Sequence, residues 1–90
     1  MISVTDSAKK HLKGALLAHS DDPDISLRLV AKPGGQLGFV LDRETKGDQV
    51  VEHKGTKVLL VGQELAPVVT GLILDVRDTA EGSELFLSRE

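Results

Sequence analysis

The chain has 90 residues, a formal net charge of −3, no cysteine, and two phenylalanines as its only aromatic residues. Its length predicts one domain, residues 1–90, with a core of modest size. The negative charge and the lack of Trp and Tyr argue against nucleic-acid binding, and the lack of thiols excludes a disulfide framework, a thiolate nucleophile and thiolate-held metal within these residues.

The first elements expected along the chain are a short strand at residues 2–4 and an amphipathic helix. Thr5 or Asp6 is a good N-cap, because its side-chain oxygen accepts a hydrogen bond from a backbone N–H that the first turn leaves unpaired. The helix is expected to continue to about His19, because apolar residues recur at intervals of three and four. This apolar stripe consists of Ala8, Leu12, Ala15 and Leu16.

Three lysines of this helix, Lys9, Lys10 and Lys13, lie off the apolar stripe. They fit a solvated helix face, which is the interpretation we favour. They also fit a basic face that docks an acidic partner, because positive charges that gather on one surface attract carboxylates.

Residues 20–24, with the sequence SDDPD, are expected to form a turn that ends the helix. A calcium loop of the EF-hand type needs ligands at alternating positions, and Pro23 interrupts that spacing. From residue 25 onward apolar residues alternate with others. The alternation predicts a strand over residues 25–31 and, after a glycine-rich loop, a second strand over residues 37–41.

The second half of the chain is expected to consist mainly of short strands. Lys54 and Gly55 predict a tight hairpin turn between two of them. A helical turn is expected over residues 63–69, because Pro67 near its start suits the first turn of a helix. The strands are expected over residues 49–53, 56–61, 71–78 and 83–88.

This order of elements predicts an α+β fold: a small distorted β-sandwich of short, mostly antiparallel strands with one N-terminal amphipathic helix. The reason is that strands follow one another without the alternating helices of a parallel sheet. No segment approaches the roughly 20 apolar residues of a membrane span, and the N-terminus lacks the basic head and apolar core of a signal peptide. We therefore expect a cytoplasmic protein that binds neither membrane nor nucleic acid.

No arrangement typical of a catalytic site is present in the sequence. A G-x-S-x-G stretch is missing, and the glycine-rich loop lacks the G-K-[ST] ending of a nucleotide-binding loop. His11 and His19 are eight residues apart on the helix and do not share one face, and His53 follows a strand. We therefore expect no enzyme, and we expect surface histidines in preference to a metal site.

The glycine-rich loop has the sequence KPGGQLGF, residues 32–39. Together with the strand before it, the loop resembles the first signature of the HesB/IscA family of A-type iron–sulfur carriers. Leu27 and Arg28 match the opening of that signature. The glycine pair and the closing Gly-Phe also match it, and Gln36 stands where the family has its first cluster-ligating cysteine. The matched glycine-pair and Gly-Phe positions are Gly34, Gly35, Gly38 and Phe39.

The resemblance continues along nearly the whole chain. Residues 5–16 resemble the family's opening helix, and residues 47–60 resemble its central hairpin. Residues 69–76, VTGLILDV, resemble a further element in which Gly71 and Asp75 are in place. The family also has a C-terminal C-G-C-G tail with two more thiolates, and residues 1–90 contain no such tail.

The resemblance implies the family's fold, and the missing thiolates imply that no cofactor is bound. We therefore expect a non-catalytic HesB/IscA-like domain that acts as an accessory or protein-interaction module linked to iron–sulfur biogenesis. Its expected partners are iron–sulfur assembly proteins and a second copy of the chain. Two alternatives stay open: a metal-binding protein that uses His and carboxylate ligands, and a small-ligand binder at the loop. The loop's candidate binding residues are Gly34, Gly35, Gln36 and Gly38.

Overall fold

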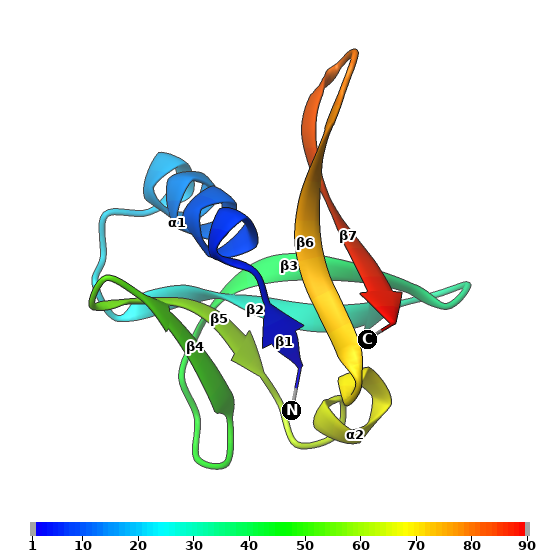
Figure 1. Cartoon of the computed structure of the whole chain (residues 1–90). Helices are drawn as coiled ribbons and strands as arrows, with labels where there is room; N and C mark the ends of the chain where they lie inside the picture. The colour runs from blue at the N-terminus through cyan, green and yellow to red at the C-terminus, as the bar shows by residue number, and fades with distance from the viewer. Residues whose placement is uncertain (1, 90) are drawn as a thin grey trace.

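The computed structural model describes residues 2–89, which form two helices and seven strands in two sheets (Figure 1). The fold is mostly β, and every element predicted from the sequence is present. In chain order the elements are β1 (Ser3–Val4), α1 (Asp6–His19), β2 (Ile25–Lys32), β3 (Gln36–Arg43), β4 (Gln49–His53), β5 (Thr56–Val61), α2 (Ala66–Val69), β6 (Leu72–Thr79) and β7 (Gly82–Arg89).

The larger sheet has the strand order β3-β2-β5-β4, and the smaller sheet has the order β1-β6-β7. Most neighbouring strands are antiparallel, as predicted, but β2 pairs with β5 and β1 pairs with β6 in parallel. Figure 1 shows the β6–β7 hairpin rising steeply from the larger sheet, with its turn pointing away from the rest of the molecule. The helix α1 lies beside this hairpin and packs on β4, β5 and β6.

The core lies between α1 and the two sheets. The helix contributes Ala8, Leu12 and Leu16, which are all buried, so the helical stripe predicted from the sequence is the buried face. The strand β5 is buried along most of its length, because it is an inner strand of the larger sheet. The other buried apolar residues are Ile2, Leu27, Leu29, Val51, Val58, Leu59, Leu60, Val61, Leu65, Val69 and Leu74.

Local sequence determines where several of these elements begin and turn. The Thr5 hydroxyl accepts a hydrogen bond from the Ala8 backbone N–H at 3.1 Å and so caps α1, as predicted. Lys54 and Gly55 have φ angles of 50° and 81°, which is the pair of left-handed conformations that a type I′ hairpin turn requires. The helix α2 is shorter than the helical turn expected over residues 63–69, with Pro67 in its first turn.

Candidate functional site

The glycine-rich loop forms a short, exposed turn at the end of the β2–β3 hairpin. Lys32 pairs with Gln36, so only residues 33–35 form the turn. Gly34 and Gly35 have φ angles of 85° and 79°, a left-handed conformation that residues with a β-carbon rarely adopt. Open space surrounds both glycines, and the Gln36 side chain beside them is exposed. The sequence therefore needs two glycines here to turn the chain within three residues.

Gly38 lies apart from this exposed turn. It is buried within β3 and pairs with Val30. A β-carbon at this position would collide with the end of the Lys32 side chain, so the missing side chain leaves room for the lysine stem. Of the four predicted site residues, the structure brings Gly34, Gly35 and Gln36 together at the surface, whereas Lys32 covers Gly38.

An apolar cleft of about 260 Å³ lies next to the glycine turn, between the β2–β3 hairpin and the β6–β7 hairpin. Side chains alternate along β3, so Leu37 and Phe39 face this cleft and Gln36 lies on the other face of the hairpin. No lining side chain carries a nitrogen, oxygen or sulfur atom. Sequence reasoning missed the cleft, although the alternating apolar residues of β3 and the consecutive apolar residues of β7 indicated its walls. The lining residues are Leu29, Gly35, Leu37, Phe39, Leu74, Leu85, Phe86 and Leu87.

Arg28, part of the family-like signature, holds the loop at residues 44–48 against β2. Its guanidinium donates two hydrogen bonds to the Asp48 carboxylate, at 2.9 Å and 2.6 Å, and one to Asp42 at 2.7 Å. These bonds hold the pKa of Asp48 at about 2 and raise the pKa of Arg28. The Thr45 backbone N–H donates to the same Asp48 carboxylate at 2.8 Å. This network is satisfied within the protein, so we assign Arg28 a structural role.

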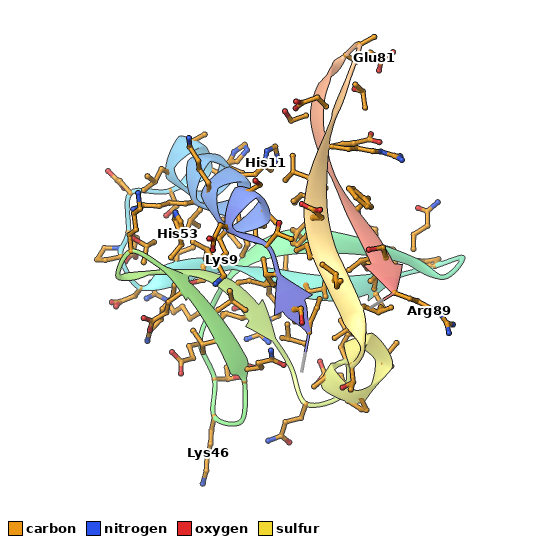
Figure 2. All side chains as sticks on the ribbon, viewed as in Figure 1. Lys9, His11, Lys46, His53, Glu81 and Arg89 are labelled. Carbon is orange, nitrogen blue, oxygen red and sulfur yellow. The ribbon has the colours of Figure 1, made fainter. Side chains whose placement is uncertain are left out.

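The sequence left the histidines open as candidate metal ligands. Within residues 2–89 there is no group of three or more His, Cys, Asp or Glu side chains that could hold a metal ion. His11 lines a groove between α1 and the β6–β7 hairpin, whereas His53 lines a groove between α1 and the β4–β5 turn. Figure 2 shows these two histidines on different sides of α1. The geometry therefore gives no support to a site of His and carboxylate ligands.

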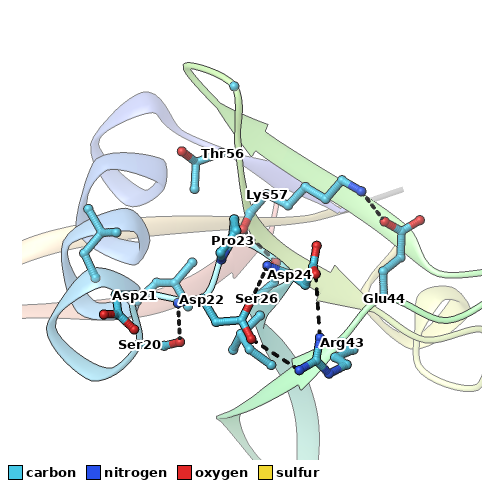
Figure 3. Close-up of a pocket in the computed structure, with 14 residues that line it drawn as sticks. Ser20, Asp21, Asp22, Pro23, Asp24, Ser26, Arg43, Glu44, Thr56 and Lys57 are labelled. Carbon is cyan, nitrogen blue, oxygen red and sulfur yellow. Dashed lines mark hydrogen bonds and ion pairs between the residues drawn. The ribbon is translucent and has the colours of Figure 1, made fainter.

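A further cleft, of about 500 Å³, lies where the end of α1, the acidic turn at residues 20–24 and the start of β5 meet. Figure 3 shows that both of its cations are paired: Arg43 contacts Asp22 at 3.2 Å, and Lys57 contacts Glu44 at 2.6 Å. Asp22 also accepts a hydrogen bond from the Asp24 backbone N–H, as in an Asx turn. The predicted turn is confirmed, and the carboxylate of Asp22 stabilises it.

In the described part of the chain, neither helix has the length and apolar character needed to cross a membrane. No protein-family model matches the sequence.

Curated and solved proteins nevertheless match along almost the entire chain. The iron-sulfur cluster insertion protein ErpA of Vibrio cholerae serotype O1 is 32% identical over 92 residues, which cover 97% of this chain and 80% of that protein. The crystal structure of Escherichia coli SufA, described as involved in biosynthesis of iron-sulfur clusters, matches with a TM-score of 0.70 and 25% identity, covering 98% of this chain and 84% of SufA. A crystal structure of IscA with a [2Fe-2S] cluster has the same fold, with a TM-score of 0.64 and 17% identity over 99% of this chain and 85% of that one.

Proposed function

This chain belongs to the HesB/IscA family of A-type iron–sulfur carriers, and we propose that it serves cluster biogenesis as a non-catalytic interaction module that does not itself hold the cluster. The observation that carries the proposal is Gln36. By the resemblance of the loop to the family's first signature, it stands where the family has its first ligating cysteine, and none of the 90 residues is a cysteine.

The donor atoms around Gln36 do not fit an iron–sulfur cluster. Clusters are held by thiolates, and occasionally by imidazoles, because soft donors match the bonding of the iron. The glutamine amide offers a neutral, hard oxygen. The cleft on the other face of the hairpin is lined by apolar side chains and Gly35, and it offers no side-chain donor at all. A bound cluster therefore has no part in the function that we propose.

The same features suit contact with a protein partner. Protein interfaces typically combine an apolar pocket, which receives a side chain, with exposed backbone groups around it. In our proposal the cleft receives an apolar side chain of an assembly or insertion protein, while the exposed glycine turn contacts the backbone beside it. We also propose that the two sheets form a distorted β-sandwich, which keeps the two hairpins apart on either side of the cleft. We further propose that the protein works in the cytoplasm.

Self-association along β3 is part of the proposal. This strand lies at the edge of the larger sheet, and its Val40 and Leu41 side chains are 43% and 44% exposed. An edge strand with exposed apolar side chains can pair with a second copy. Sedimentation of the wild-type chain and of Val40→Lys tests this point: a dimer in the wild type and a monomer in the variant support it, whereas a wild-type monomer at about 100 μM refutes it.

The interaction role is tested by titrating the isotope-labelled chain with ErpA of V. cholerae, in its apo and cluster-loaded forms, and recording amide chemical shifts. We expect shifts at Gly35, Leu37 and Leu85, and we expect Leu37→Asp to abolish them. The control is Leu17→Asp, because Leu17 is 59% exposed and lies on α1. The proposal fails if neither form of ErpA shifts these amides. Shifts caused by a small polar ligand alone would instead favour the second candidate, ligand binding at the open backbone of Gly34 and Gly35.

A further inference from the structure

A basic groove of about 600 Å³ runs between the N-terminal half of α1 and the β4–β5 turn. It shares no residue with the apolar cleft or the glycine turn. One wall comes from the helix and the other from the hairpin, which the packing of α1 on β4 brings together. We call it the α1 groove. Its lining residues are Asp6, Ser7, Lys10, Lys13, His53 and Lys54.

Within residues 2–89, the three lysines of the α1 groove form no ion pair, whereas four of the eight other lysines and arginines do. Elsewhere, Arg28, Arg43, Arg77 and Lys57 each contact a carboxylate. Within residues 2–89, no carboxylate lies within ion-pair distance of the three groove lysines, although Asp6 lines the same groove. Three unpaired ammonium groups thus face one carboxylate, in a chain whose net charge is −3.

This local excess of positive charge suits the groove to binding an anionic partner. Like charges held close together repel one another, and an incoming set of carboxylates relieves that repulsion. Lysine ammonium groups are compact point charges without the forked geometry of arginine, so they suit several separate carboxylates. The negative charge of the rest of the chain and the absence of Phe, Tyr and Trp from the groove disfavour a nucleic acid.

We propose that the α1 groove docks an acidic segment, a short run of Asp and Glu, on a partner protein. The lysines of α1 then contact the acidic run from one side and Lys54 contacts it from the other. Lys10 and Lys13 are two of the three helix lysines for which the sequence left a solvated face and a basic docking face as alternatives. They thus contribute to one wall of a two-sided site. This inference does not depend on the proposed function, because it uses a different surface.

The test measures binding of a fluorescein-labelled peptide of about ten glutamates by fluorescence anisotropy, at about 50 mM and about 300 mM NaCl. The groove variant is Lys10→Glu combined with Lys54→Glu, which reverses one charge on each wall. The matched control is Lys46→Glu combined with Arg89→Glu. It changes the net charge by the same amount at two exposed sites, which Figure 2 shows away from α1.

We expect the wild type to bind the peptide and the higher salt concentration to weaken binding at least about fivefold, because salt screens exposed charges. The groove variant should lose at least about tenfold in affinity, whereas the control should stay within about threefold. Amide shifts on titration should fall at Lys10, Lys13 and Lys54. Thermal unfolding of both variants verifies that they remain folded.

Three results would overturn the proposal. The first is no binding of the peptide by the wild type at the lower salt concentration. The second is an equal loss in both double variants, which would mean that only net charge matters. The third is tighter binding of a duplex DNA of about 20 base pairs than of the peptide under the same conditions, which would assign the groove to nucleic acid.

Discussion

Thr5 and Asp75 are 70 residues apart in the sequence, yet the Thr5 hydroxyl donates a hydrogen bond to the Asp75 carboxylate at 2.8 Å. The same hydroxyl oxygen accepts a hydrogen bond from the Ala8 backbone N–H, so one atom caps α1 and also ties it to β6. The Thr5 backbone N–H donates to the Leu74 carbonyl at 3.0 Å and reinforces the junction. Asp75, a position matched in the family-like element, thus has a structural explanation.

Replacing Thr5 with valine should destabilise the protein by about 1 to 2 kcal/mol, because the variant loses the helix cap and leaves Asp75 without its hydroxyl donor. Thr5→Ser is the matched control, since it keeps the hydroxyl and should lose less than about 0.5 kcal/mol. Urea unfolding followed by far-ultraviolet circular dichroism measures both values. Equal stabilities for the two variants would show that the hydroxyl is not what holds this junction.

The network of Arg28 and Asp48 should make stability depend on pH in acid. The pKa of Asp48 is about 2 in the folded chain, below the usual 3.8, and its side chain is only 3% exposed. A carboxyl group with a lowered pKa in the folded state contributes stability that is present above the unfolded pKa and is lost as the pH falls through the folded one. We therefore expect about 1 to 2 kcal/mol to be lost from this group between pH 4 and about pH 2.

Substituting Asp48 identifies the group responsible. Asp48→Asn should be less stable at pH 7, because the half-buried guanidinium of Arg28 loses one of its two charged partners. Its stability should also change less between pH 4 and pH 2. Asp21→Asn alters an exposed carboxylate without an ion pair in residues 2–89 and should keep the wild-type profile. If the Asp48 variant follows the wild-type profile in acid, another carboxyl group causes the pH dependence.

Much of the fold could be predicted from the sequence because its signals are local. The cap at Thr5, the helical stripe ending near His19, and the turn at Lys54 and Gly55 each depend on residues within a few positions of one another. Alternating apolar residues likewise predicted β2 and β3 nearly to their ends. Such features follow from the conformational preferences of individual residues and from the spacing of apolar residues along the chain.

The features that sequence reasoning missed depend on packing between distant segments. The apolar cleft needs Phe39 and Leu85 on facing hairpins, and no spacing rule places two residues that lie so far apart in the chain. The α1 groove likewise needs Lys54 beside the lysines of α1. At Gly38 the loop pattern suggested an open backbone, whereas the side chain of Lys32 from the paired strand covers it.

Alanine substitutions at two glycines should have opposite effects on stability. Gly35 has a φ of 79°, so Gly35→Ala should cost about 1 kcal/mol through backbone strain, even though space is free around it. Gly14 lies on an exposed part of α1 with nothing near its β-carbon position, so Gly14→Ala should stabilise the protein by up to about 1 kcal/mol. Thermal unfolding of the two variants measures both changes. A stabilising Gly35→Ala would contradict the left-handed turn.

Introducing a cysteine at position 36 should not by itself allow a cluster to bind. Gln36 is exposed beside the turn, so the thiol of Gln36→Cys should react fast with a thiol reagent and should be free to bind iron. One thiolate cannot complete the coordination of a cluster, and the cleft offers no other side-chain donor. We therefore expect the monomer fraction of this variant, incubated anaerobically with ferrous iron and sulfide and then desalted, to show no charge-transfer absorption in the visible region. Gln36→Ser is the matched control for the size of the side chain. A stoichiometric cluster on a monomer, verified by sedimentation, would contradict the prediction and show that this scaffold supplies further ligands. A cluster found only on a dimer would mean that two chains had combined their thiolates.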